Sequence, residues 1–402
     1  MAYYGKLKNQ NHSIMKKIIA IQMFGNKNES FASFKESVKA LINDGFVVEV
    51  ITTDSQAAVL DDVKGLHMHT LNNKEQHNKV FKLYMFVKVQ IQLFIKMFQM
   101  TTRHDVIYIN SIYSVAPAIV AKIKRAKLVC HLHSAKQKSS VADKVLIYLI
   151  NKTAHQVIFT SASLKDEFSL TVAKQAVVYN TPTDDFISNI DPLRITNRSK
   201  RFTALMITSS DDAGAISKIT ELATRLPLVN FEILLHDWTS QTAKLVINSD
   251  QPANLRILPE NNNVHRFYER ADVLINLSAN EYNASGDIDV MHAMYYGIPV
   301  IVPAKSGLQE LISAGKHGVA IDVDQVPTNV QTIQHLSANT LIYKQLSAAC
   351  ISQARLFTSD QFKAQFTKLF NGHRARPYDN LIQLFGNAYL STDTSLFSGK
   401  AA

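Results

Sequence analysis

A short run of small and acidic residues, Ser285-Gly286-Asp287-Ile288, stands where the chain is expected to pass from a buried strand into a helix. The first turn of a helix carries backbone N–H groups without helical partners and the positive end of the helix dipole, and such ends bind phosphate. The pattern therefore predicts an anion site over Ser285 to Ile288. Asp287 would repel an anion there unless its charge is offset.

Two histidines, His131 and His133, lie at the end of a second apolar run, which is predicted to be a strand over 128–131. An imidazole can donate or accept a proton near neutral pH, so it suits the recognition of hydroxyl groups at a transfer site. We expect His133, which lies just beyond the strand, to reach such a site. A structural role for either histidine fits the pattern equally well.

Apolar strand patterns alternate with amphipathic helix patterns along most of the chain, which is typical of an α/β protein with parallel sheets. A helix is predicted over 31–42 and another that ends at Gly297. Ligands of such sheets bind beyond the carboxyl ends of the strands. The strands are predicted at 17–23, 47–51, 106–110, 128–131 and 156–159, and again at 202–208, 231–235, 255–258, 273–277 and 299–302.

The length of 402 residues favours two domains, and 46% hydrophobic with 19% charged residues excludes a disordered chain. We predict an N-terminal extension at 1–14, a first domain at 15–188, a polar linker at 189–201, a second domain at 202–372 and a tail at 373–402 with a helix near 380–389. Residues 1–14 lack the apolar core of a signal peptide. The two cysteines are too few for a disulfide scaffold and favour the cytoplasm.

The formal net charge of +10 indicates an anionic partner, either nucleic acid, a membrane surface or a phosphorylated substrate. No nucleic-acid-binding module is recognisable. Residues 77–100 are apolar but interrupted by lysines, with Lys88, Gln92, Lys96 and Gln99 at helical spacing. This profile predicts a helix lying on the cytoplasmic face of an anionic membrane. A core-facing helix whose lysines extend to solvent is an equally good interpretation.

The sequence contains no motif for several other kinds of catalytic or binding site. The sequence has no P-loop motif, no zinc-ligand spacing and no Gly-x-Ser-x-Gly motif. We therefore predict no metal and no cofactor.

Several residues at fixed spacing resemble the sugar-nucleotide-binding segment of the retaining GT-B glycosyltransferases of family 4 (glycosyl transferases group 1). The resemblance implies two Rossmann-like domains facing a cleft, a nucleotide-diphosphate sugar as donor, retention of configuration and no obligatory metal. The last helix of such proteins often crosses back onto the first domain. The matching residues are Ala271-Asp272, Ser278, Ala293-Met294, Gly297, Pro299-Val300-Ile301, Gly307, Glu310 and Gly318.

The resemblance also assigns site residues, with two departures from the family pattern. Asp211 and Gly214 occupy the positions of the basic pair that neutralises the donor diphosphate. The two family glutamates align with Ala284 and His292, and a shifted pair, Glu281 and Asp289, has the same separation. The candidates are His133, Glu281 and Asp289 for catalysis, Gly25-Asn26 beside the reacting sugar, and Ser209, Ser210, Lys218, Ser285, Gly286, Asp287, Ile288, His292 and Glu310 for donor binding.

We interpret the chain as a hexosyltransferase that acts on a lipid-linked or oligosaccharide acceptor in surface polysaccharide or glycoconjugate biosynthesis. The loss of the basic pair and of both glutamates leaves an alternative, a catalytically degenerate GT-B protein that binds a partner or a glycan. An epimerase of the same architecture is a weaker possibility, because nothing singles out its carboxylates.

Overall fold

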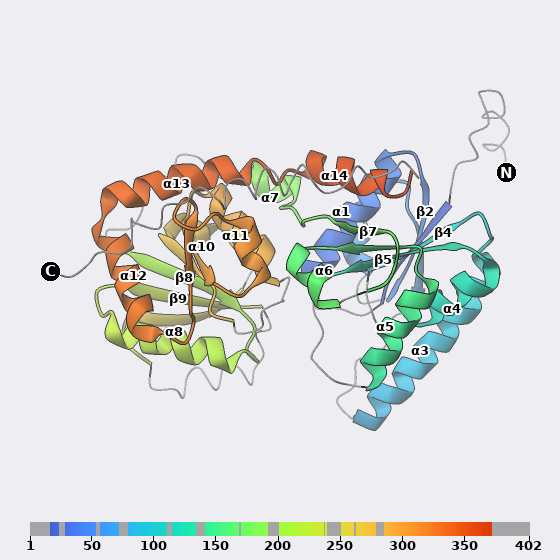
Figure 1. Ribbon diagram of the computed structural model, residues 1–402, viewed down its shortest axis with the longest axis horizontal. Coiled ribbons are helices and arrows are strands. Elements are labelled where there is room, and N and C mark those ends of the chain that lie inside the picture. Colours follow the sequence, from blue (N-terminus) through green and yellow to red (C-terminus); the bar gives the residue numbers. More distant parts are fainter. Residues whose placement is uncertain are drawn as a thin grey trace.

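The computed structural model describes residues 17–23, 29–53, 57–71, 79–110, 115–133, 141–168, 170–191, 201–236, 238, 251–260, 263–278 and 285–371. In this part of the chain, helices and parallel strands form two α/β domains that lie side by side (Figure 1). The predicted two-domain fold is confirmed.

The first domain contains a seven-stranded sheet with the order β3-β2-β1-β4-β5-β6-β7, and all its neighbouring strands are parallel. The inner strands are continuous apolar runs because helices cover both faces of the sheet. The strands are β1 (Lys17–Gln22), β2 (Val47–Thr53), β3 (His67–Leu71), β4 (Val106–Ile109), β5 (Lys127–Leu132), β6 (Gln156–Phe159) and β7 (Gln175–Val177).

Successive residues of β1 enter two different cores, as the alternation of side chains along a strand requires. Ile19 and Ile21 pack with the buried residues of α3, α4 and α5, whereas Ile18 and Ala20 pack with α1. The helical elements of this domain are α1 (Glu29–Asn43), the 3-10 helix η1 (Ala58–Leu60), α3 (Lys79–Met100), α4 (Val115–Lys124), α5 (Val141–Thr153), α6 (Ala162–Phe168) and α7 (Asp184–Ser188).

The second domain repeats this plan with six parallel strands in the order β10-β9-β8-β11-β12-β13. Its strands are β8 (Thr203–Thr208), β9 (Asn230–Leu235), β10 (Leu255–Pro259), β11 (Val273–Ile275), β12 (Val300–Pro303) and β13 (Gly318–Ile321). Its helices are α8 (Ala213–Arg225), α10 (His265–Arg270), α11 (Ser285–Tyr295), the 3-10 helix η2 (Gly307–Leu311), α12 (Val326–Ala338) and α13 (Thr340–Ala354).

Two short helices, α7 and α14 (Ser359–Lys368), pack across the domain boundary. Phe186 of α7 is buried in the core of the second domain. The helix α14 leaves the second domain and packs on the first, where Phe362, Phe366 and the following Phe370 join the core beside α1. A helix of the described part of the chain, α14, thus crosses back to the first domain (Figure 1). The helix expected at 380–389 lies outside the described residues.

The strands that the sequence did not predict are β3, β7 and β13, and each lies at an edge of its sheet. Edge strands are half-covered, so their sequences lack a continuous apolar run. The predicted extension at 1–14, most of the linker and the tail at 373–402 lie outside the described residues. No helix in the described part of the chain is long and apolar enough to cross a membrane.

Candidate functional site

Polar side chains gather at the carboxyl ends of both sheets, near the points where the strand order reverses. In the first sheet the reversal lies between β1 and β4, and in the second between β8 and β11. Ligands of doubly wound sheets bind at these points. Elements that follow the strands also meet across the domain boundary, because α1 contacts α11 and α6 contacts η2.

The first-domain cluster consists of Gln22, Tyr108, Asn110, His131 and His133, which come from β1, β4, β5 and the residues that follow them. His133 Nε2 lies 2.6 Å from Asn110 Oδ1, and the Tyr108 hydroxyl donates to the same oxygen at 3.0 Å. Tyr108 also lies 2.8 Å from His131 Nδ1. The predicted His133 therefore belongs to a hydrogen-bonded network.

This network fixes the protons on both imidazoles. An amide oxygen only accepts, so His133 carries its proton on Nε2, and Tyr108 uses its single proton toward Asn110. His131 then donates from Nδ1 to Tyr108. Burial lowers the pKa of His133 to about 4 and holds the pKa of His131 well below its ordinary value. Both rings are therefore neutral at pH 7, and their hydrogen bonds are made without a positive charge.

Three side chains of this cluster keep polar atoms without a partner among the residues that the structure describes. These atoms are His131 Nε2, His133 Nδ1 and both amide atoms of Gln22, which is 0% exposed. The two imidazole nitrogens carry lone pairs, so they accept hydrogen bonds. A buried polar atom without a partner costs about 1–3 kcal/mol. A ligand with hydroxyl donors would satisfy the two nitrogens.

The crossing helix α14 supports the first-domain cluster from one side. The Phe366 ring packs edge-on against Tyr108 with ring centroids 5.6 Å apart, and it lies 5.9 Å from the His131 ring. Phe34 of α1 stacks on Tyr108 as well, at 6.0 Å. Because Tyr108 positions both Asn110 and His131, these aromatic contacts orient the whole network.

The start of α11 lies at the domain boundary, and the predicted helix N-terminus at Ser285 is confirmed. Asp287 accepts a hydrogen bond from Asn180 Nδ2 at 2.9 Å and one from the backbone of Ile288 at 2.7 Å. Ser33 of α1 donates to Asn180 Oδ1 at 2.7 Å, so a polar chain joins the two domains. Burial raises the pKa of Asp287 to about 7 despite these hydrogen bonds.

Packing around Gly286 leaves no room for a side chain at the start of α11. A Cβ atom at this position would lie 2.6 Å from Asn276 Nδ2 and 3.1 Å from Leu308 Cδ1. Residues from β11 and η2 therefore approach the backbone closely here. The side chain of Ser285 lies outside the described part of the structure.

A second-domain cluster of His236, Glu260, Tyr268 and Asp289 lies beyond β9 and β10. The Tyr268 hydroxyl donates to Asp289 Oδ1 at 3.0 Å, and His236 lies between Asp289 Oδ2 at 4.0 Å and Glu260 Oε2 at 2.5 Å. Burial raises the pKa of Asp289 to about 6, His236 opposes this rise, and Glu260 adds to it. The arrangement can exchange a proton near neutral pH.

His292, which the resemblance aligns with a family glutamate, is engaged in stacking. Its ring lies nearly parallel to Phe186 with centroids 3.5 Å apart, and His265 stacks on the same phenylalanine at 4.5 Å. Burial lowers the pKa of His292 to about 3, and His265 contributes to the same effect. His292 is therefore a neutral, half-buried ring beside Asp289.

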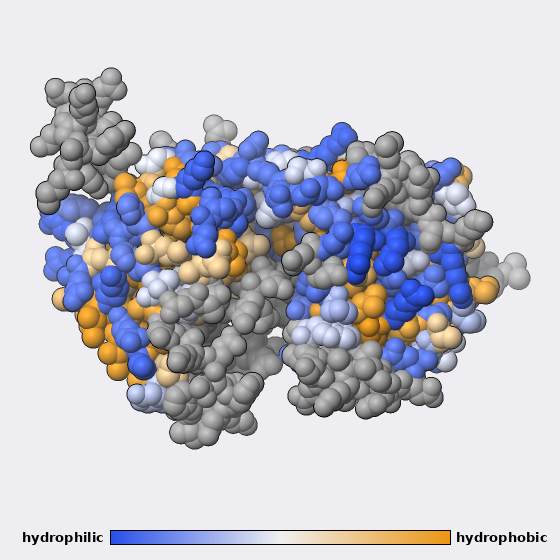
Figure 2. Space-filling model, turned by 180° about the vertical axis from the view of Figure 1, so that it is seen from behind, coloured by the Kyte–Doolittle hydropathy of each residue, from blue (hydrophilic) through white to orange (hydrophobic). Residues whose placement is uncertain are grey.

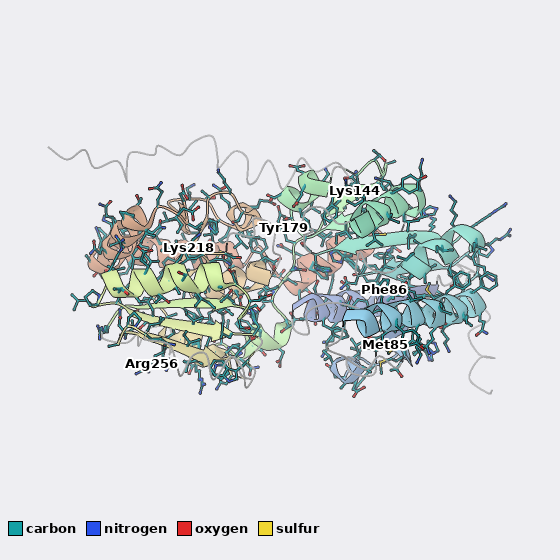
Figure 3. All side chains as sticks on the ribbon, turned by 90° about the horizontal axis from the view of Figure 1, so that it is seen from below. Met85, Phe86, Lys144, Tyr179, Lys218 and Arg256 are labelled. Atoms are coloured by element: carbon teal, nitrogen blue, oxygen red, sulfur yellow. The ribbon has the colours of Figure 1, made fainter. Side chains whose placement is uncertain are left out.

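The start of α8 carries an acidic cap. Asp212 accepts a hydrogen bond from the backbone N–H of Ala215 at 3.1 Å. Lys218 forms an ion pair with Asp324 at 2.7 Å, and Figure 3 places it away from the domain boundary. Ser209 and Ser210 lie between β8 and α8, where their backbone is half-buried beside this cap.

Glu310 of η2 reaches into the first domain. Its carboxylate accepts hydrogen bonds from the backbone of Ala162 at 2.8 Å and of Ser163 at 2.5 Å, at the start of α6. The Ser163 hydroxyl and the Tyr179 hydroxyl, the latter at 3.0 Å, donate to it as well. Figure 3 shows Tyr179 between the two domains. Glu310 therefore joins the domains in this structure, and its predicted role in donor binding stays a prediction.

Three predicted residues, Gly25, Asn26 and Glu281, lie outside the described residues. The structure adds His236, Glu260 and Asn180, which sequence reasoning did not select as site residues. The first two are polar residues directly after adjacent predicted strands, so this position was a usable signal. Within the described ranges, no group of three or more His, Cys, Asp or Glu is arranged to hold a metal ion.

Two doubly wound parallel domains that meet at their carboxyl ends, with a helix crossing back to the first, define the GT-B class. Solved structures agree with this assignment. Anabaena HepE in complex with UDP and glucose has a TM-score of 0.71 and 16% identity over 89% of this chain and 99% of that one. Sucrose-phosphate synthase from Thermosynechococcus elongatus gives 0.70 and 14%, over 92% and 100%. A complex of S. aureus TarM that contains UDP gives 0.67 and 12%, over 89% and 100%.

The sequence family agrees with the fold. Residues 235–357 match the model of the family named glycosyl transferases group 1. No curated protein matches the sequence. The prediction of a GT-B fold is confirmed, and the family model matches part of the second domain.

Proposed function

We propose that the chain transfers a hexose from a nucleotide-diphosphate sugar to a lipid-linked or oligosaccharide acceptor, with retention of configuration. The observation that carries this proposal is the position of the matched segment. Residues 235–357 contain His236, Glu260 and Asp289 together with α11, so the part of the chain that matches the family supplies the polar cluster of the second domain.

The two clusters support different parts of the reaction. The second-domain cluster provides hydrogen-bonding groups for the ribose and the transferred sugar, and the start of α11 provides backbone amides for the diphosphate. In the first domain, the free nitrogens of His131 and His133 would accept hydrogen bonds from sugar hydroxyls. Because HepE and TarM have been crystallised with UDP, a UDP-sugar is the first donor to test.

A second candidate function is a GT-B protein without catalysis that binds a partner or a glycan. Two observations favour it. Asp212 puts a carboxylate at the start of α8, and Lys218 is paired with Asp324, so neither residue supplies positive charge to a diphosphate. In this alternative, the first-domain cluster still binds a sugar, but the protein does not catalyse glycosyl transfer.

Isothermal calorimetry with UDP, GDP and their sugar conjugates separates the two functions. The proposal expects saturable binding of one nucleotide, weaker binding by Asp289→Asn, and slow hydrolysis of the donor. The control Asp61→Asn, at an exposed residue after η1, should leave binding unchanged. A folded protein that binds no nucleotide would refute the transferase. If it then binds an oligosaccharide, the non-catalytic alternative stands.

We place the reaction on the cytoplasmic face of a membrane, as part of surface polysaccharide or glycoconjugate synthesis. The chain's net charge of +10 supports this setting, because an anionic leaflet attracts basic proteins. The transfer itself requires no metal or cofactor under this proposal.

A further inference from the structure

Exposed apolar side chains are concentrated on one surface of the first domain. Nine of the fourteen exposed large hydrophobic residues in the described part of the chain belong to α3, α4 and α5. These helices lie side by side over one face of the sheet (Figure 1). We call this set the three-helix surface: Tyr84, Val87, Ile91, Ile95 and Phe98 on α3, Ile119 and Ile123 on α4, and Val145 and Tyr148 on α5.

On α3, two apolar stripes face opposite directions. Val89, Leu93 and Met97 are 0% exposed and fill the core, whereas Ile91 and Ile95 are 55% and 52% exposed. The inner stripe accounts for the packing of the helix on the sheet. The outer stripe does not contribute to the core, so the core-facing interpretation explains only half of this helix.

The three helices form one continuous surface. The Lys124 ammonium of α4 lies 3.8 Å from the centre of the Phe98 ring of α3, which ties their outer faces together. On α5, the Lys152 ammonium lies 5.8 Å from the Tyr148 ring. Figure 2 shows exposed hydrophobic atoms at the lower left, over the corner of the first domain that carries α3 and α4.

The charged side chains of these helices are mostly positive. Together α3, α4 and α5 contain eight lysines and one acidic residue, Asp143. An anionic leaflet presents negative charge to basic residues near its surface. Lysines beside apolar and tyrosine side chains suit the boundary between headgroups and acyl chains.

We propose that the three-helix surface binds the anionic leaflet of a membrane, with its apolar side chains inserted and its lysines at the headgroups. The apolar stripe from Tyr84 to Phe98 spans about 21 Å along α3, at about 1.5 Å per residue, so the helix lies in the plane of the leaflet. This extends the binding surface from α3 to two further helices, and it does not depend on the transfer activity.

Sedimentation with vesicles tests the surface on the full chain. The protein should bind phosphatidylcholine vesicles that contain phosphatidylglycerol, bind less at high salt, and not bind phosphatidylcholine alone. Removing three charges with Lys88→Ala, Lys122→Ala and Lys144→Ala should weaken partitioning on the order of 100-fold, since each lysine contributes about fivefold. The Ile91→Gln and Ile95→Gln pair should weaken it on the order of tenfold.

Matched controls lie on the second domain. Leu228 and Leu341 are 82% and 68% exposed, so Leu228→Gln and Leu341→Gln should leave vesicle binding unchanged. Thermal unfolding and nucleotide binding report whether the variants fold. Wild-type protein that stays in the supernatant with anionic vesicles would overturn the proposal. A dimer in light scattering that Ile91→Gln and Ile95→Gln dissociate, without vesicle binding, would assign the surface to self-association instead.

Discussion

Replacing Asp287 with asparagine should stabilise the protein at alkaline pH and have little effect in acid. Asp287 is 7% exposed at the start of α11, where it accepts hydrogen bonds from Asn180 and Ile288. An amide has nearly the same shape, and its carbonyl oxygen still accepts from Asn180. Its NH2 group then faces the N–H of Ile288, as the hydroxyl of the neutral carboxyl does. The substitution therefore removes an ionisable group while it keeps the contact between the domains.

The magnitude follows from the pKa of Asp287, which burial raises from its ordinary value of 3.8 to about 7. A raised pKa means that the folded protein favours the neutral carboxyl. This contribution to stability is complete below about pH 4 and is lost as the pH rises through 7. About three pKa units correspond to about 4 kcal/mol, at about 1.4 kcal/mol per unit.

Thermal unfolding at about pH 4 and about pH 8.5 measures the effect. Asp287→Asn should resemble wild type at the lower pH and unfold about 8 °C higher at the upper pH, since 1 kcal/mol shifts the melting temperature of such a domain by about 2 °C or more. The exposed Asp211→Asn control should show no such difference. Equal melting temperatures of Asp287→Asn and wild type at both pH values would refute the burial argument.

Three further substitutions test other parts of the site. Glu310→Gln places an NH2 group among donors, so it should cost about 1–3 kcal/mol of interdomain contact; faster proteolysis between the domains would report it, and an unchanged rate would contradict it. His133→Ala should lower donor turnover about 100-fold, and His133→Gln should recover part of this loss. Because the pKa of His133 is about 4, wild-type rates should show no titration of this group near neutral pH. Lys218→Ala should leave nucleotide affinity within about twofold, because Lys218 is paired with Asp324; a large loss in calorimetry would restore it as a phosphate ligand.

The central strands were predictable because burial on both faces requires apolar runs. The expected strands at 156–159 and 231–235 agree with β6 and β9 to within a residue. The same reasoning placed the start of α11, where the apolar run of β11 gives way to small residues. Three of the four edge strands, β3, β7 and β13, were not predicted, because half-exposed strands carry a weaker signal.

Two glycines of the matched family motif are explained by the backbone geometry around them. Gly297 has a φ of 63° at the end of α11, where other residues are strained, and a Cβ on Gly318 would lie 1.9 Å from the carbonyl oxygen of Val300. Both matched glycines therefore serve a turn and a close approach of strands. Their presence supports the fold and carries no information about a ligand.

The role of a side chain depends on what approaches it from elsewhere in the chain, which local patterns do not encode. Glu310 and Tyr179 are 131 positions apart, and their hydrogen bond exists because the domains are in contact. The same holds for Asn180 and Asp287. The spacing within one motif predicted the helix or strand on which a residue lies, but it could not predict which residues of the other domain contact it.

The two helix starts of the second domain offer an anion different charges. At α8, the carboxylate of Asp212 occupies the N–H of Ala215 and adds negative charge to the helix end. At α11, Asp287 likewise accepts from the N–H of Ile288, but burial keeps it partly neutral near pH 7, so the positive end of the helix dipole is offset less. The resemblance to the family leads us to expect a basic pair beside the first of these helices, where this chain has Asp211 and Gly214. Under the proposed function, the donor's negative charge is therefore met at α11, and the protonation of Asp287 and the binding of the diphosphate favour each other.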